Sequence, residues 1–167
     1  IADKFIHLFG SHAPYTLNAD GTRNNGNTNV VEQTKGVFSM LYLLFDQMKE
    51  KGIYKDAEII ITADHGNPVS DTKPVSKATC IGLFHKPSGS EGTPLTESKA
   101  PVSHKNIPAT LLKSIGYENY REFGTPLDEV PENDTTPRYY YKSVVEAPNI
   151  HESKIYKYEI IGNARDF

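Results

Sequence analysis

Hydrophobic positions first follow a helical period between residues 29 and 52. They recur at intervals of three and four and so lie on one face of a helix: Val37, Met40, Leu41, Leu44, Phe45 and Met48. Asn29 is a favourable N-cap, and Glu32 three residues later fits a capping box. Gly52, after a basic turn, is typical of a helix end. The pattern predicts one long helix whose apolar face packs in a core.

Short continuous apolar runs on both sides of this helix predict strands. Residues 4–9 and 57–62 are such runs, and a further strand is expected over residues 78–84. Continuous apolar strands are typical of a sheet covered on both faces, and the order strand, helix, strand indicates a βαβ unit with parallel strands. A shorter helix is expected over residues 108–115, with Asn106 as its cap. The sequence therefore predicts an α/β fold with a mainly parallel sheet.

The last part of the chain has a different pattern. Residues 138–145 and 154–161 alternate polar with apolar or aromatic side chains, as paired antiparallel strands do. Sheet packing explains the three consecutive tyrosines in the first of these strands, and a platform for stacking sugars or bases is the alternative. We therefore divide the chain into residues 1–137, an α/β part, and residues 138–167, an antiparallel extension packed on the same domain.

Composition narrows the classes of function. The 167 residues are 37% hydrophobic and 23% charged, which suits one ordered domain or part of one, and the net charge of −3 argues against nucleic-acid binding. The segment has no run apolar enough for a transmembrane helix and no signal peptide. The single cysteine, Cys80, excludes an internal disulfide and a Cys-rich metal site, and we expect a buried, unreactive thiol. Because the chain begins at Ile1 without a methionine, we expect a piece of a longer protein.

Candidate chemistry collects at two predicted strand ends. His7 and His12 lie at the end of the first predicted strand and in the long loop after it, residues 10–29, and Asp64 and His65 follow the isoleucine-rich strand. Parallel strands would bring both pairs to one crevice, where ligands collect in α/β sheets. Each pair alone is more often structural, whereas imidazole and carboxylate groups together can bind one divalent cation. A metal-assisted site and a purely structural role stay open at this point.

Three segments in this order resemble the alkaline phosphatase/sulfatase superfamily: FIHLFGSHAPY (residues 5–15), IIITADHG (59–66) and APVSHKNIPATLLKSIG (100–116). The resemblance covers residues 1–145 and is strongest to lipoteichoic acid synthase-like and phosphoethanolamine transferase-like enzymes. It implies a three-layer αβα half-domain, with residues 1–137 as the C-terminal part of a sulfatase-like catalytic domain.

The resemblance also implies roles for individual residues. Asp64 and His65 match the pair that binds the catalytic divalent metal, which would be Zn, Mn, Mg or Ca. His12 matches a histidine that contacts the transferred phosphate or sulfate. His7 matches an earlier histidine that binds substrate or a second zinc. The substrate would be a phosphate or sulfate ester, on a lipid headgroup or a glycan, with phosphoglycerol or phosphoethanolamine transfer favoured over sulfate-ester hydrolysis.

The departures from the family are equally specific. Nothing in the chain fills the positions of the nucleophile and the first acidic metal ligand, which we expect upstream, so this fragment alone is expected to be inactive and without metal. A histidine shortly after the ADHG motif is also missing; Lys73 or Lys77 could contact the anion there, although solvated loop lysines are the better interpretation. His85 and His104 match framework positions.

The parent protein would be membrane-anchored on the extracytoplasmic face of a bacterial cell, with no membrane contact by this segment. One alternative is a non-catalytic domain that keeps the fold and binds glycans or protein through its tyrosine-rich strands. A weaker alternative is an unrelated metallohydrolase that completes its site at a dimer interface.

Overall fold

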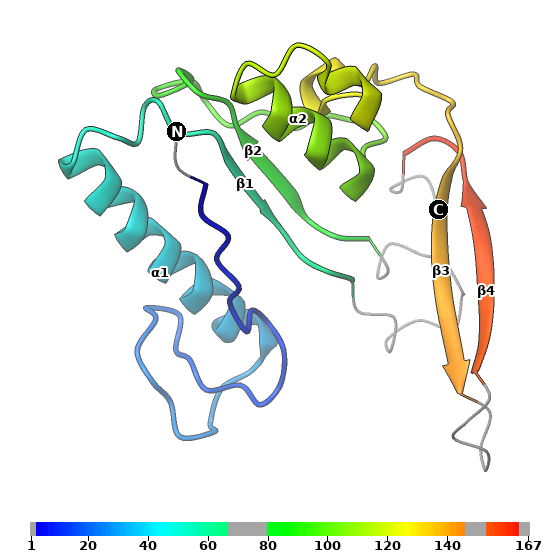
Figure 1. Ribbon diagram of the computed structural model, residues 1–167. Helices are drawn as coiled ribbons and strands as arrows, with labels where there is room; N and C mark the ends of the chain where they lie inside the picture. Colours follow the sequence, from blue (N-terminus) through cyan, green and yellow to red (C-terminus); the bar gives the residue numbers. More distant parts are fainter. Residues whose placement is uncertain (1–2, 67–79, 146–152, 164–167) are drawn as a thin grey trace. The chain divides into compact units, whose positions relative to one another are not determined.

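The computed structural model describes residues 3–66, 80–145 and 153–163 as a mixed α/β chain (Figure 1). The described residues divide into two compact units, Ile1–Ala57 with Lys86–Gly92 and Glu58–His85 with Thr93–Phe167. The helices and strands are α1 (Val30–Glu50), β1 (Ile59–Thr62), β2 (Leu83–Lys86), α2 (Ile107–Ser114), β3 (Arg138–Val145) and β4 (Ser153–Ile160), with 3-10 helices η3 (His104–Asn106), η4 (Tyr120–Phe123) and η5 (Leu127–Glu129). Within the described residues no helix is long and apolar enough to cross a membrane.

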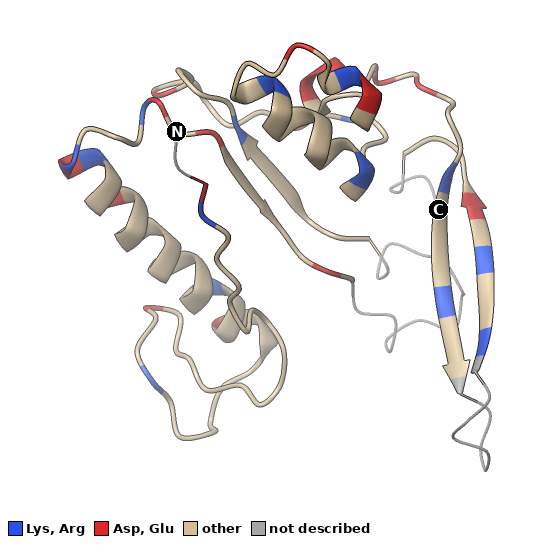
Figure 2. Cartoon of the chain, in the orientation of Figure 1, with Lys and Arg blue, Asp and Glu red and all other residues tan. Residues whose placement is uncertain are grey.

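Helix α1 forms where the sequence predicts it. The side chain of Asn29 accepts hydrogen bonds from the amides of Val31 and Glu32 at 2.9 and 3.1 Å, which satisfies two backbone donors of the first turn. The helix ends before Gly52, whose φ of +69° is the left-handed conformation that favours glycine. Figure 2 marks charged residues at both ends of α1. Acidic Glu32 lies in the first turn and basic Lys49 in the last, the arrangement that suits the helix dipole.

The most buried face of α1 differs from the predicted apolar stripe. The stripe is only half-buried, and its Met40 is 39% exposed, whereas Gln33 and Gly36 are buried. The loop over residues 10–29 lies against this face. For example, Ser39 of the helix donates a hydrogen bond of 2.7 Å to the carbonyl of Ala19 in the loop. Gln33, Gly36 and Ser39 therefore lie against the loop, and the predicted apolar stripe is half-buried rather than buried.

The strand predicted over residues 4–9 does not form, so the expected βαβ unit is wrong for the described residues. A strand needs a ladder partner for its backbone groups, and within the described residues this segment has none. The apolar side chains that suggested a buried strand are exposed, with Phe5 at 91% and Phe9 at 69%. The run is extended chain rather than the first strand of a parallel sheet.

The described strands form two separate two-stranded sheets, β1–β2 and β3–β4, both antiparallel. Strand β1 covers the last four positions of the predicted strand at 57–62. Strand β2 begins at Leu83, near the end of the one predicted over residues 78–84; residues 78 and 79 lie outside the described part. The described part of the chain thus shows mixed α/β structure without the mainly parallel sheet.

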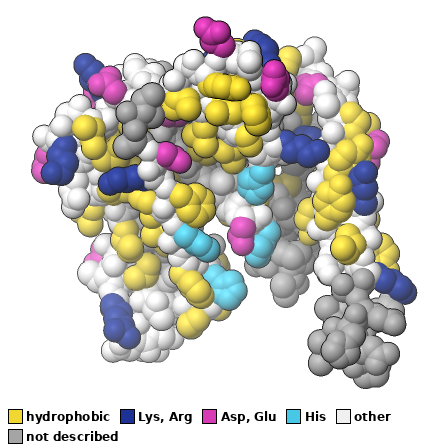
Figure 3. Space-filling view, in the orientation of Figure 1, with side chains coloured by type: hydrophobic (Ala, Val, Ile, Leu, Met, Phe, Trp, Pro, Cys, Tyr) yellow, Lys and Arg dark blue, Asp and Glu magenta, His cyan; other side chains and the backbone are white. Residues whose placement is uncertain are grey.

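The second unit has a small core at α2. Ala109 and Thr110 are buried with Pro126 and Leu127, and the hydroxyl of Thr110 donates to the carbonyl of Asn106 and accepts from the amide of Leu127. The capping differs from the prediction, since the side chain of Asn106 does not cap α2; it completes a capping box with Ser103 one turn earlier, at η3. Figure 3 shows hydrophobic side chains gathered over α2. Exposed members are Leu111, Ile115, Tyr117 and Phe123.

The C-terminal hairpin forms as predicted. Strands β3 and β4 pair antiparallel from Arg138 opposite Ile160 to Val145 opposite Ser153. The rings of Tyr140 and Tyr158, directly opposite each other, have centroids 6.2 Å apart. Alternation in sequence therefore correctly predicted this sheet.

Candidate functional site

Asp64 and His65 follow β1 after one residue, Ala63, and their side chains are open to solvent, 86% and 65% exposed. One atom of each side chain is held by the backbone. Oδ1 of Asp64 accepts a hydrogen bond of 2.9 Å from the amide of His65, and Nδ1 of His65 donates to the carbonyl of Gly66 at 2.6 Å. The remaining atoms, Oδ2 of Asp64 and Nε2 of His65, are 3.6 Å apart. The backbone thus holds both side chains so that one possible metal-ligand atom of each lies close to the other.

This spacing fits a shared divalent cation. A tetrahedral cation about 2.1 Å from both atoms would need them about 3.4 Å apart. A metal-binding histidine usually donates its second ring nitrogen to a carbonyl or carboxylate, as His65 does here to Gly66. Within the described residues, however, no three His, Cys, Asp or Glu side chains form a group that could hold a metal ion. The pair supplies two ligands, fewer than the four of a tetrahedral site.

His104 from η3 contacts the backbone just before this pair. Its Nε2 lies 2.8 Å from the carbonyl oxygen of Ala63, to which it can donate, and 3.4 Å from Oγ1 of Thr62. This hydrogen bond ties η3 to the turn that presents Asp64. No pattern in the sequence indicates this contact, because the two segments are about forty positions apart. The framework role expected for His104 follows from the resemblance alone.

His7 and His12 belong to the first compact unit, and Asp64 and His65 to the second. His7 is exposed and has no hydrogen bond to another described residue. The ring of His12 stacks edge-on against Phe9 with centroids 5.2 Å apart, and its Nδ1 is bonded to the carbonyl of Ala13. In each of these histidines Nε2 has no hydrogen bond to another described residue, so it can contact a ligand.

An open pocket of about 280 Å³ lies in the first unit, near the start of the loop. It is lined mainly by apolar side chains from residues 8–17 and from α1, among them Leu8, Phe9, Val37 and Met40. Both polar atoms of its side chain Gln33 are bonded to the loop, because Oε1 accepts from the amides of Thr16 and Leu17 and Nε2 donates to the carbonyl of Gly10, each at 2.9 Å. The pocket therefore has mainly apolar walls, and the polar atoms of Gln33 hold the loop.

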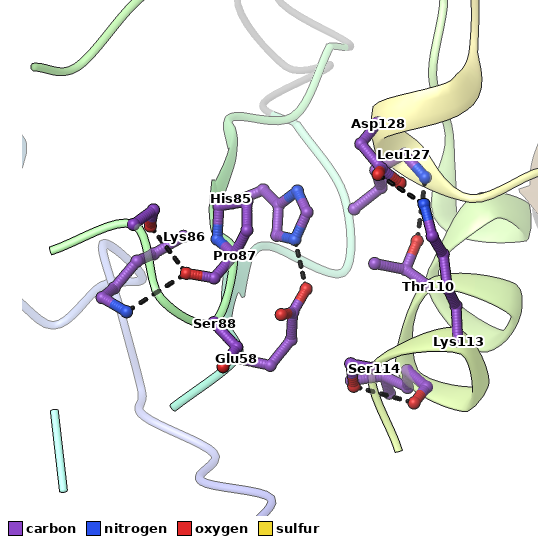
Figure 4. A network of polar contacts seen from close by, with 12 residues as sticks. Glu58, His85, Lys86, Pro87, Ser88, Thr110, Lys113, Ser114, Leu127 and Asp128 are labelled. Carbon is purple, nitrogen blue, oxygen red and sulfur yellow. Dashed lines mark hydrogen bonds and ion pairs between the residues drawn. The ribbon is translucent and has the colours of Figure 1, made fainter. Parts of the chain in front are cut away.

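A second carboxylate–imidazole pair joins β2 to the residue before β1. Glu58 and His85 are each only 14% exposed, and Oε1 of Glu58 lies 2.5 Å from Nε2 of His85 (Figure 4). Because both side chains are mostly covered and bonded to each other, the pair stabilises the β1–β2 sheet. His85 thus forms a structural contact.

The other candidates have simpler surroundings. Lys73 and Lys77 lie outside the described residues. Cys80 is half-buried, and burial raises the pKa of its thiol, which lowers the thiolate fraction at neutral pH. This environment suits an unreactive thiol rather than a nucleophile.

Comparisons with models of protein families, with curated proteins and with solved structures find no match for the chain.

Proposed function

We propose that this chain is the C-terminal part of a metal-dependent enzyme that transfers or hydrolyses phosphate or sulfate esters. The finer fold that goes with this proposal is a three-layer αβα catalytic half-domain, followed by the antiparallel hairpin. One observation carries the proposal: Oδ2 of Asp64 and Nε2 of His65 lie 3.6 Å apart just beyond the end of β1, with their other polar atoms held by the backbone.

In this proposal Asp64 and His65 hold a divalent cation, which would be Zn, Mn, Mg or Ca. When bound, such a cation stabilises the negative charge that develops on phosphate or sulfate oxygens. His104 keeps the turn in place through its bond to Ala63, and so acts as a positioning residue. His12 and His7 contribute imidazole nitrogens to the anionic substrate.

The nucleophile comes from outside this chain in the proposed enzyme, because no residue here matches its position in the superfamily. Transfer of phosphoglycerol or phosphoethanolamine is favoured over sulfate-ester hydrolysis, since the GSHAPY form and the Asp–His pair are closer to the phosphoryl-transfer branch. The proposed site of action is the outer face of a bacterial membrane, with the membrane anchor outside these residues.

Metal binding tests the first part of the proposal. Titration with Mn²⁺ should broaden amide NMR signals around residues 63–66 at low occupancy, because the paramagnetic ion would lie beside them. Asp64→Asn and His65→Gln should each abolish this local broadening. Asp56→Asn, an exposed carboxylate in the other compact unit, is the matched control and should change nothing. Broadening that survives both variants would show that the ion binds elsewhere.

Turnover tests the second part. The 167-residue chain with a divalent metal should hydrolyse neither bis(p-nitrophenyl) phosphate nor p-nitrophenyl sulfate, because the nucleophile is not in it. Metal-dependent hydrolysis that disappears in Asp64→Asn would refute the external nucleophile while leaving the metal site intact.

A further inference from the structure

Positive charge gathers on the C-terminal hairpin, although the chain as a whole has a net charge of −3. Figure 2 marks basic residues in blue along both β3 and β4. The described strands carry four cations, Arg138, Lys142, Lys154 and Lys157, against one carboxylate, Glu159. The hairpin is thus a local basic region.

The strand register divides this hairpin into two faces. Tyr139, Tyr141 and Ser143 of β3 lie opposite Glu159, Lys157 and Ile155 of β4, and alternation places these six side chains on one face. We call this set the open face, because Tyr141 is 57% and Ile155 69% exposed. The neighbouring positions, with Tyr140 and Tyr158, form the other, more covered face. A broad aromatic and apolar surface is therefore available on the open face.

Two ammonium groups meet on one ring of the open face. Nζ of Lys157 lies 3.8 Å, and Nζ of Lys105 from η3 lies 5.4 Å, from the centroid of Tyr139. Among the described residues neither lysine has an ion pair with a carboxylate, and Glu159 has none either. A cation–π contact orients an ammonium group but does not neutralise its charge. Two ammonium groups therefore lie beside the half-exposed ring of Tyr139 and next to the exposed Tyr141, and Glu159 is the one carboxylate on the same face.

We propose that the open face, together with Lys105, binds an acidic polysaccharide. Sugar rings have apolar C–H faces that pack on exposed tyrosines such as Tyr141, while their anionic groups pair with Lys105 and Lys157. The anionic groups are either carboxylates of uronic acids or ester groups on the sugar. Two lysines beside a tyrosine favour a polymer bound by stacking and by few charges over a nucleic acid, whose binding depends on many phosphate contacts.

This binding surface needs no metal and no nucleophile, so it stands independently of the proposed enzymatic role. It adjoins that site in the fold, because η3 carries both Lys105 and His104, and His104 contacts the residue before Asp64. A polysaccharide held here would be kept close to the Asp64–His65 turn.

Calorimetric titration of the 167-residue chain in EDTA tests the proposal. Polygalacturonate, dextran sulfate and neutral dextran serve as probes, and inorganic polyphosphate is a charged polymer without sugars. We expect acidic polysaccharide to bind and dextran not to bind. Lys105→Gln and Lys157→Gln should each weaken binding about two- to fivefold, the range for exposed ion pairs. Lys142→Gln removes the same charge from the opposite face of β3 and should leave affinity unchanged.

The role of stacking is tested with Tyr141→Ser, which should weaken the binding of acidic polysaccharide but not the binding of polyphosphate. Binding to polygalacturonate alone would identify uronate carboxylates as the ligand groups, and binding to dextran sulfate alone would identify ester groups. The proposal is overturned if no acidic polysaccharide binds. It is equally overturned if Lys142→Gln matches the two other lysine variants, or if polyphosphate or single-stranded DNA binds as tightly and Tyr141→Ser has no effect. Unchanged circular dichroism of each variant confirms that the fold is kept.

Discussion

Replacing Gln33 with leucine removes the side chain that connects α1 to the loop of residues 10–29. Gln33 is only 3% exposed, and its amide group makes three hydrogen bonds of 2.9 Å, from the amides of Thr16 and Leu17 and to the carbonyl of Gly10. Leucine has nearly the same volume and a similar helix propensity. The change therefore removes the polar contacts while it leaves the packing and the helix almost intact.

The expected loss of stability follows from these contacts. A net hydrogen bond contributes about 1 kcal/mol, and a buried backbone group left without a partner costs a further 1–3 kcal/mol. Since Thr16 is exposed and water can reach its amide, the full cost of an unpaired buried group applies to only some of the three backbone groups that Gln33 bonds. We expect Gln33→Leu to lower the free energy of holding the loop by about 2–4 kcal/mol.

Two measurements check this value. Hydrogen exchange at the amides of Thr16 and Leu17 should accelerate by roughly 30- to 1000-fold if the loop opens locally, since about 1.4 kcal/mol corresponds to a factor of ten. Urea unfolding followed by tyrosine fluorescence, which suits a chain with ten Tyr and no Trp, reports any global loss. Gln47→Leu, at an exposed position of the same helix, is the control. If the two variants differ by less than about 0.5 kcal/mol in both measurements, Gln33 does not anchor the loop.

Three further predictions concern other contacts. Gly36→Ala should destabilise by roughly 1–3 kcal/mol in urea unfolding despite the better helix propensity of alanine, because its Cβ would lie 2.3 Å from a loop carbonyl oxygen; an increase in stability would contradict this packing. The hydrogen bond from Lys113 lowers the pKa of Glu129 below its ordinary 4.5, so its stabilising effect is complete above that value and is lost as pH falls through the lowered one. Glu129→Gln should therefore flatten the acid side of the melting-temperature profile, whereas the exposed control Glu118→Gln should not. Burial raises the pKa of Cys80, so iodoacetamide should react with it more slowly at neutral pH than with free cysteine, and equal rates would contradict the environment described.

Elements with local signals could be predicted from the sequence. The cap at Asn29, the helical period and the left-handed Gly52 all act within a few residues, and α1 spans Val30–Glu50 between them. The hairpin β3–β4 was also predictable, because alternation and proximity in sequence specify the same pairing. In these places local and tertiary preferences agree.

Elements that depend on distant partners could not be predicted. The run at residues 4–9 has the composition of a strand, yet a strand exists only with a partner, and the described residues offer none. The orientation of β1 and β2 depends on tertiary packing, which apolar runs do not encode. The face of α1 that holds the loop was missed because it is built on Gln33 and Gly36, a polar residue and a glycine that hydrophobic periodicity ignores.

The candidate site was predicted only in part, because some of its features depend on local sequence and others on distant contacts. The placement of Asp64 and His65 at the end of β1 follows from their position after an apolar run, and the structure has them there with converging donor atoms. The contact of His104 with Ala63 joins segments about forty residues apart, and no spacing in the sequence indicates it. Local order specifies the pair, whereas tertiary contacts determine what surrounds it.

Because Gln33 anchors the loop, the rotation of α1 about its own axis must match the position of the loop in the first unit. Each residue of an α-helix turns the chain by about 100°, so one residue inserted between Asn29 and Gln33 would carry the amide group away from the loop while the helix itself could still form. A change of four residues would nearly restore the phase but shift the anchor by about 6 Å along the axis. Variation in length is therefore expected to be tolerated within the loop, where Gly26 has open space around it, and not in the first turn of the helix.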